Sequence, residues 1–160
     1  MATTGSMSAG VLDDSIKYKR IGDVNRAEVV ILIKAYIEES CPDIVASESN
    51  ATALLDSADL SSHAAMASEK VVGFTLLCPI NNLQLKMRIL HAVGTYVSPE
   101  YRRRRIGESL RRMAMIVARD MGYDKLQGVA YSEHAAGSVG KLGGKVVAAV
   151  LETSLKPVGE

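Results

Sequence analysis

Hydrophobic and polar positions follow two different periods along this chain, which predicts a domain with both helices and strands. The strongest repeat has helical spacing and ends at Gly122, a residue type that commonly closes helices. Its members are Ile106, Leu110, Met113, Val117 and Met121. In contrast, residues 15–21 alternate with a period of two, which is typical of a strand. The pattern therefore predicts a first strand over 15–21 and an amphipathic main helix from Ile106.

The segment after the first strand carries a helix start signal. Asn25 precedes Glu28 by three residues, which resembles a capping box, and we expect a helix through Ile37. The hydrophobic run 29–33 is also compatible with a buried strand, but the cap and the total length favour the helix. A second, weaker helix is expected over 49–60.

The middle of the chain changes to strand patterns, with turns expected at 68–70 and 79–82. The remaining expected elements are strands 63–67, 70–78 and 85–97, strand 125–131, a short helix 134–142 ending at Gly143, and a final strand 146–155. This order predicts an α/β (α+β) fold with one mixed sheet of about six strands and about four helices. Because the main helix connects strands 85–97 and 125–131, we expect these two strands to be parallel neighbours.

Length and composition narrow the function classes. The 160 residues, 48% hydrophobic and 23% charged, suit one domain, which we place at 13–160 after a disordered leader at 1–12. A formal charge of +1 and 4% aromatic residues argue against nucleic-acid binding. The hydrophobic runs are far shorter than the roughly 20 residues of a membrane span, so no membrane contact is expected. Two cysteines without metal-ligand spacing predict no disulfide framework and no metal site, and they indicate the cytoplasm.

The segment 97–110 joins a strand end, a basic turn and the start of the main helix. Four consecutive arginines at 102–105 precede Gly107. A helix N-terminus presents unpaired N–H groups and the positive end of the helix dipole. A glycine there lets an anion approach the backbone. The residues alone favour a pyrophosphate site, and the alternative is a solvated helix start with an incidental glycine.

The same segment resembles the acyl-CoA-binding signature of the GNAT superfamily of N-acetyltransferases, V-x-P-x-x-[RQ]-x-x-G-x-[GA]-x-x-L. The residues in register are Val97, Pro99, Tyr101, Arg102, Ile106, Gly107 and Leu110. Segments 65–74 and 141–144 resemble the family more weakly, and the resemblance covers about 16–155. It implies a GNAT-like fold and an enzyme that transfers an acetyl group from acetyl-CoA to a primary amine. The acceptor would be a small molecule or a protein, and the transfer would be direct, within a ternary complex.

The resemblance also implies where acetyl-CoA binds. Strand 85–97 would splay from strand 125–131, and the pantetheine arm would lie in that opening and pair with the backbone of Thr95, Tyr96 and Val97. A strand N–H near Val97 would polarise the thioester carbonyl. The diphosphate would lie on main-chain N–H groups of 103–108, beside the Ser109 hydroxyl. The expected cofactor-binding residues are Thr95, Tyr96, Val97, Arg102, Arg103, Arg104, Arg105, Ile106, Gly107, Glu108 and Ser109.

Two positions depart from the family pattern. Arg105 replaces the first glycine, so its side chain either crowds the diphosphate or reaches a phosphate. Val139 stands where many relatives carry a tyrosine that protonates the leaving thiolate, and 90–97 contains no carboxylate. These departures keep open an alternative, an acyl-CoA-binding regulatory module with little or no turnover.

The catalytic candidates that remain are His91, Tyr96, Ser132 and His134. His91 is the first choice for a base, because an imidazole titrates near neutrality. A structural role for His91, as a partly buried strand histidine, is the competing interpretation.

Two further expectations concern partners. The resemblance places the acceptor amine at the loop 40–50 and strand 125–131, where Glu39, Asp43 and Glu48 would suit a cationic amine. The tail after 146–155 is a poor strand because it contains Pro157, so we expect a homodimer that covers the apolar edge left there.

Overall fold

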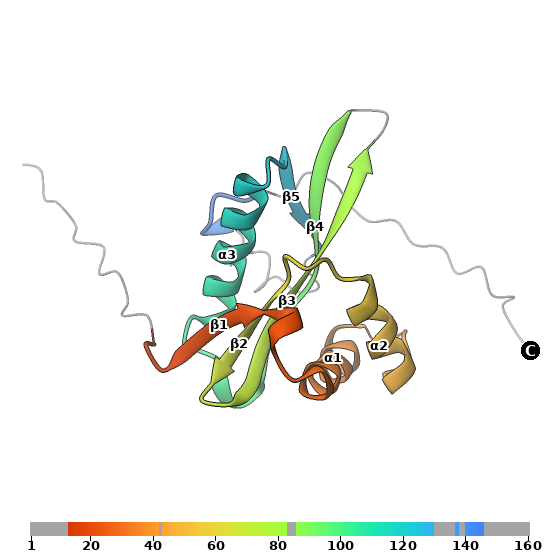
Figure 1. The fold of residues 1–160 in the computed structure, drawn as a ribbon, viewed down its shortest axis with the longest axis vertical. Coiled ribbons are helices and arrows are strands. Elements are labelled where there is room, and N and C mark those ends of the chain that lie inside the picture. The colour runs from red at the N-terminus through yellow and green to blue at the C-terminus, as the bar shows by residue number, and fades with distance from the viewer. Residues whose placement is uncertain (1–12, 42, 83–85, 130–136, 138–139, 146–160) are drawn as a thin grey trace, which may run out of the picture. The chain divides into compact units, whose positions relative to one another are not determined.

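The computed structural model describes residues 13–41, 43–82, 86–129, 137 and 140–145 (Figure 1). The chain divides into two compact units, 1–129 and 130–160, and all regular elements named below lie in the first. They are β1 (Ile16–Arg20), α1 (Arg26–Ser40), α2 (Glu48–Ser57), β2 (His63–Ala67), β3 (Lys70–Asn82), β4 (Met87–Val97), α3 (Ile106–Asp120) and β5 (Lys125–Gly128). Short 3-10 turns at Ile21–Asp23 and Pro99–Tyr101 precede α1 and α3.

One mixed sheet joins the strands in the order β1-β2-β3-β4-β5. Strands β1 to β4 pair antiparallel, whereas β4 and β5 pair parallel. The predicted α/β class and the parallel neighbours on either side of the main helix are thus confirmed. The described residues contain five strands and three α-helices. The expected strand 146–155 and most of the expected helix 134–142 lie outside them.

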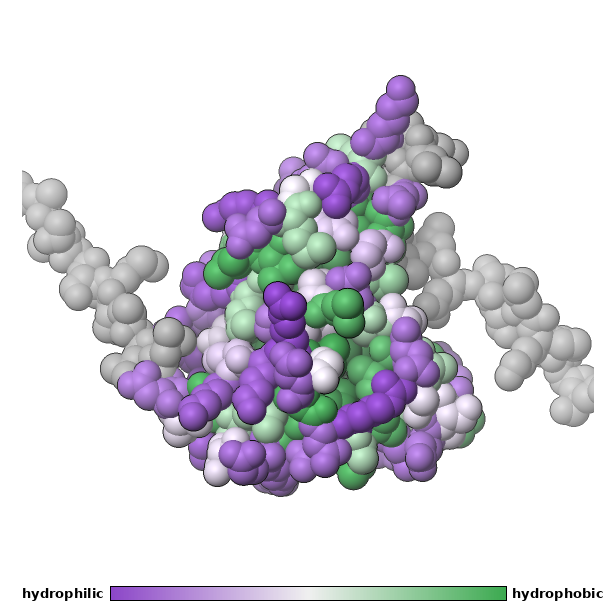
Figure 2. Space-filling view, in the orientation of Figure 1, coloured by the Kyte–Doolittle hydropathy of each residue, from purple (hydrophilic) through white to green (hydrophobic). Residues whose placement is uncertain are grey.

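Helices cover both faces of the sheet (Figure 1). On one face, α1 buries Ile33 against Phe74 and Tyr96. On the other face, α3 buries Leu110 against Val72. In the view of Figure 2, hydrophilic side chains dominate the periphery and hydrophobic ones show mainly in the centre, as expected for amphipathic elements packed on a sheet. Within the part that the structure describes, no helix has the length and apolar character that crossing a bilayer requires.

Helix α1 begins where its cap predicts. The Asn25 side chain accepts hydrogen bonds from the backbone N–H groups of Ala27 (3.0 Å) and Glu28 (3.3 Å). However, the Glu28 carboxylate does not close a capping box on Asn25. It accepts instead from the Val71 N–H of β3 at 2.8 Å. The residue that the sequence assigns to a local cap therefore ties the helix to the sheet.

The buried face of α3 differs from the predicted hydrophobic face. Ala114 and Ala118 are 1% and 5% exposed, whereas Met121 is 45% exposed. Small side chains face the sheet because they let the helix lie close to β3 and β4, with Leu77 and Leu90 filling the layer between them. The periodicity predicted the helix correctly and its contact face only in part.

The strand β3 is longer than predicted and passes through Pro79. The expected turn at 79–82 is wrong, because pairing with β4 continues to Asn82. Pairing with β2 ends at Thr75, and beyond it none of the other described strands pairs with β3 on that side. Instead, the Leu77 backbone bonds there to Ser62 Oγ (N–H donor, 2.9 Å) and to the Asp59 N–H (2.7 Å). Pro79 lies two residues after Leu77, so its backbone faces the same edge of β3. Because no strand pairs with this edge among the described residues, the N–H that proline lacks interrupts no hydrogen bond of the sheet.

Three aromatic rings hold the middle of β4 against α1. Tyr36 lies edge-on to Phe74 and Tyr96, with ring centroids 5.9 and 6.3 Å away. Its hydroxyl donates to the Val93 carbonyl at 3.2 Å. The ring lies directly over Gly94, where an added Cβ would come within 2.8 Å of the Tyr36 Cζ atom. Glycine at this position therefore allows the helix to approach the strand.

In the second unit, the described residues include the expected glycine turn. The Lys141 N–H donates to the Gly137 carbonyl at 3.2 Å and the Gly143 N–H to the Gly140 carbonyl at 3.0 Å. Gly143 has a φ of +82°, the left-handed conformation that glycine adopts at helix ends.

Gly94→Ala is expected to destabilise the protein by roughly 1 to 3 kcal/mol, the usual range for overpacking a buried site. The Tyr36 ring cannot move away freely, because Phe74 and Tyr96 confine it. Urea denaturation followed by circular dichroism measures the change. Gly22→Ala is the matched control, since nothing lies within 4 Å of the Cβ it adds. Equal stability of the two variants would contradict the packing described here.

Candidate active site

The parallel strands β4 and β5 share only part of their length. Their register runs from Ile89–Lys125 to Ala92–Gly128, whereas β4 continues to Val97. At this point the β3–β4 register shifts, since Leu76 pairs with Gly94 and Leu77 with Ala92. Val93 is therefore the extra residue of a β-bulge, a feature that commonly ends pairing or redirects a strand. Among the described residues, 93–97 have no β5 partner, and β4 presents an open edge there.

The backbone groups on this open edge follow from the last bond to β3. The Ser98 N–H donates to the Val72 carbonyl at 2.8 Å, which marks a bonded pair. Because bonded and non-bonded pairs alternate in an antiparallel ladder, the Tyr96 backbone faces β3. The backbone N–H and C=O groups of Thr95 and Val97 then face the open edge. Of the three residues expected to pair with pantetheine, these two have the suitable orientation.

The basic turn after β4 has an unusual backbone. Arg103 and Arg105 have φ angles of +65° and +60°, in the left-handed region that favours glycine. Arg105 is the N-cap of α3, with ψ of 17°. This conformation explains physically why a glycine is expected at position 105. Arg105 adopts this left-handed conformation although it is not a glycine.

The first turn of α3 offers backbone donors. The first bond of the helix runs from the Ser109 N–H to the Arg105 carbonyl at 3.0 Å, and the Arg105 side chain makes no cap. The N–H groups of Ile106, Gly107 and Glu108 precede it and have no hydrogen-bond acceptor in the described part of the chain. A Cβ on Gly107 would contact Arg111 and Val97 atoms at 3.6 and 3.7 Å, so it would fit the fold but would cover this backbone. The donors and the absent Cβ suit a diphosphate.

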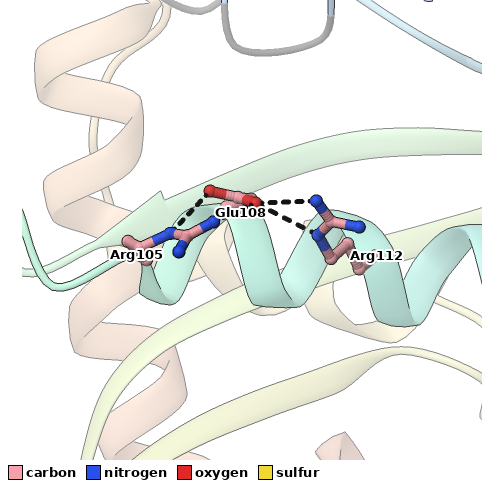
Figure 3. A network of polar contacts seen from close by, with 3 residues as sticks. All are labelled: Arg105, Glu108 and Arg112. Carbon is pink, nitrogen blue, oxygen red and sulfur yellow. Dashed lines mark hydrogen bonds and ion pairs between the residues drawn. The ribbon is translucent and has the colours of Figure 1, made fainter. Parts of the chain in front are cut away.

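A charged network lies at this helix start (Figure 3). The Arg105 guanidinium donates to both Glu108 carboxylate oxygens, at 3.0 and 2.9 Å, and Arg112 donates to one of them at 3.1 and 2.9 Å. The hydrogen bonds from Arg105, followed by those from Arg112, lower the pKa of Glu108 to about 2. Glu108 is thus ionised at any ordinary pH. It orients two guanidinium groups while leaving the network with a net positive charge.

The side chain of Arg102 folds back over the end of β4. Its Nε donates to the Val97 carbonyl at 2.9 Å, and its Nη2 pairs with the Glu39 carboxylate at 2.6 Å. Its guanidinium carbon lies 5.3 Å from the centre of the Tyr96 ring. Burial, and then the charge of Glu39, raise the pKa of the Tyr96 phenol. Tyr96 is therefore a neutral phenol, only 7% exposed.

His91 lies on the paired part of β4, before the bulge. It is opposite Cys78 of β3 and Gln127 of β5. Partial burial lowers the pKa of the imidazole from its usual 6.5. The ring is therefore largely neutral at pH 7, the form that a base requires.

The remaining sequence candidates fall into two groups. Ser132 and His134 lie outside the described residues, as does Val139. The structure brings Tyr96 and Arg102 together with Glu39, which the sequence placed only beside the acceptor loop. This contact joins residues 63 positions apart, so no local pattern could have indicated it.

Across the described ranges, no group of three or more His, Cys, Asp or Glu side chains is arranged to hold a metal ion.

Comparison with known proteins gives one family. Residues 31–148 match the family model described as the Acetyltransferase (GNAT) family. A search of curated protein sequences found no significant match.

Several solved structures share the fold. The Trypanosoma brucei acetyltransferase Tb11.01.2886 is 16% identical (TM-score 0.67), over 88% of this chain and 99% of its own. A ribosomal-protein-alanine N-acetyltransferase from Brucella melitensis is 19% identical (TM-score 0.62), over 89% and 99%. An aminoglycoside acetyltransferase from an uncultured soil metagenomic sample, in complex with sisomicin, is 15% identical (TM-score 0.66), over 91% and 100%.

Proposed function

Because the chain belongs to the Acetyltransferase (GNAT) family, we propose that it is an acetyl-CoA-dependent N-acetyltransferase acting on a primary amine. One observation carries this proposal. The open edge of β4 at 93–97 leads through a basic turn to the start of α3, where the first N–H groups have no acceptor among the residues that the structure describes. An extended amide arm followed by a diphosphate requires this sequence of donors and acceptors.

The residues present fit the parts of acetyl-CoA. The pantetheine amides pair with the backbone of Thr95 and Val97, in the way that a peptide adds to a sheet edge. The diphosphate binds the N–H groups of 103–108 and the positive end of the α3 dipole. Arg105 and Arg112, held by Glu108, add positive charge beside it. Gly107 leaves room for the phosphate oxygens.

The proposed reaction is direct transfer in a ternary complex. The acceptor nitrogen attacks the thioester carbonyl carbon, the carbon–sulfur bond breaks, and CoA leaves as a thiolate that then takes up a proton. The nitrogen loses one proton to a base or to water. A backbone N–H near Val97 stabilises the negative charge that develops on the carbonyl oxygen. His91 is the proposed base, and Tyr96, Ser132 and His134 remain the other catalytic candidates.

A second candidate function is an acyl-CoA-binding regulatory module. The observation that favours it is Arg105, an arginine in a left-handed conformation at the place of a glycine. The two functions differ in turnover, so release of free thiol from acetyl-CoA in an amine panel separates them. The panel should include proteins and aminoglycosides, since the similar structures include a ribosomal-protein-alanine N-acetyltransferase and an aminoglycoside acetyltransferase.

We also propose a cytoplasmic location and a homodimer. Cys41 and Cys78 are free thiols, which suits a reducing compartment. The apolar sequence at 146–155 supports the dimer, because an edge strand with the hydrophobic residues expected there would need a cover. Light scattering at low micromolar concentration is expected to give twice the chain mass. A monomer mass that does not change with concentration would exclude the homodimer.

Gly107→Val is expected to weaken CoA binding by at least about tenfold, or roughly 1.4 kcal/mol, without unfolding the protein. The added side chain covers the backbone donors of the first turn, while its Cβ meets nothing closer than 3.6 Å. Isothermal titration calorimetry measures the affinity. Gly22→Val serves as control, because its Cβ has no neighbour within 4 Å and it lies outside the site. Undiminished affinity of a folded Gly107→Val protein would remove the diphosphate assignment.

If His91 is the base, kcat/KM should rise with pH through one ionisation whose midpoint lies below 6.5. The sign follows from burial, which lowers the pKa, so the basic form already dominates at neutral pH. His91→Ala should lower kcat by roughly 10²-fold or more and abolish this limb. Wild-type rates in His91→Ala between pH 5 and 8 would assign His91 a structural role.

A further inference from the structure

The guanidinium of Arg102 contacts three groups that together suit the binding of a cation. The Glu39 carboxylate and the Val97 carbonyl accept its hydrogen bonds at 2.6 and 2.9 Å, and the face of the Tyr96 ring lies 5.3 Å away. A carboxylate, a carbonyl oxygen and an aromatic face are the features that recognise ammonium groups in proteins. In this structure the chain's own guanidinium fills the position.

The end of α1 increases the preference of this position for positive charge. The last turn contains Glu38 and Glu39 and no basic residue. The carbonyl groups at a helix C-terminus add partial negative charge, so carboxylates there are unfavourable without a nearby cation. Arg102 is the cation that pairs with Glu39. If Arg102 moved away, an unpaired carboxylate would remain at the negative end of the helix.

One partner of Arg102, the Val97 carbonyl, also belongs to the proposed binding site of the acyl donor. The Val97 carbonyl faces the open edge of β4, and it is one of the acceptors that an extended amide would use there. An amide that pairs with this edge therefore donates to the same oxygen that the Arg102 Nε uses in this structure. One side chain thus links the acyl-donor edge to the acidic end of α1.

We propose that Glu39 and the Tyr96 ring bind a cationic group of the acceptor, and that Arg102 fills this position until the acyl donor engages Val97. This inference rests on the proposed function. The nitrogen that pairs with Glu39 is held as an ammonium and cannot attack a thioester. The acceptor class is therefore a primary amine that carries a second cationic group, and its binding follows that of the acyl donor.

The test measures binding of α,ω-diaminoalkanes, from 1,4-diaminobutane to 1,8-diaminooctane, with monoamines of equal length as references. Calorimetry is done with and without saturating CoA. In the wild type, we expect the best diamine to bind at least tenfold more tightly than its monoamine, and only when CoA is present. Glu39→Gln should abolish this preference. Glu38→Gln is the matched control, because it removes the same charge one residue away, from a side chain outside the Arg102 contact.

Arg102→Gln completes the design, since glutamine can still donate to Val97 but has no charge. It should bind the diamine without CoA, and thermal unfolding establishes that it is folded. Equal diamine affinity in Glu39→Gln and Glu38→Gln would overturn the inference, as would equal affinity for diamine and monoamine in the wild type. Failure of the wild type to bind CoA would instead refute the proposed function.

Discussion

The candidate site depends on the bulge in β4, and the hydrogen bond from the Tyr36 hydroxyl to the Val93 carbonyl holds this bulge. Val93 is the extra residue of the β4 bulge, and a bulge leaves a carbonyl without its ladder partner. Tyr36 supplies that partner from α1, and its ring fills the space over Gly94. Beyond this contact β4 no longer pairs with β5. The packing of one helix thus stabilises the irregularity that opens the sheet edge.

The sequence predicted the elements that depend on neighbouring residues. Strand 63–67 was predicted with its observed bounds, and the Asn25 cap lies where its spacing placed it. The parallel pairing of β4 and β5 followed from the helix between them. Each of these features is determined within a few residues or by a general rule of chain connection.

Features set by distant contacts were not predictable in the same way. Glu28 bonds to Val71, and Arg102 to Glu39, across 43 and 63 residues. The path of β3 through Pro79 depends on where β2 ends. The sequence of segment 97–110 indicated the basic turn, and it showed that Arg105 stands in place of the family's first glycine. Only the structure shows the left-handed backbone there and the pairing of Arg105 with Glu108 beside Arg112.

The contacts of Leu77 have a consequence for self-association. Where β3 extends past β2, its edge would offer free backbone groups to a strand of another molecule, which is a common route to aggregation. Ser62 and the Asp59 N–H bond to the Leu77 backbone at this edge, and Pro79 has no donor two residues later. A foreign strand would find the first donor and acceptor engaged and the next donor missing. This stretch of β3 is thereby protected against intermolecular strand addition.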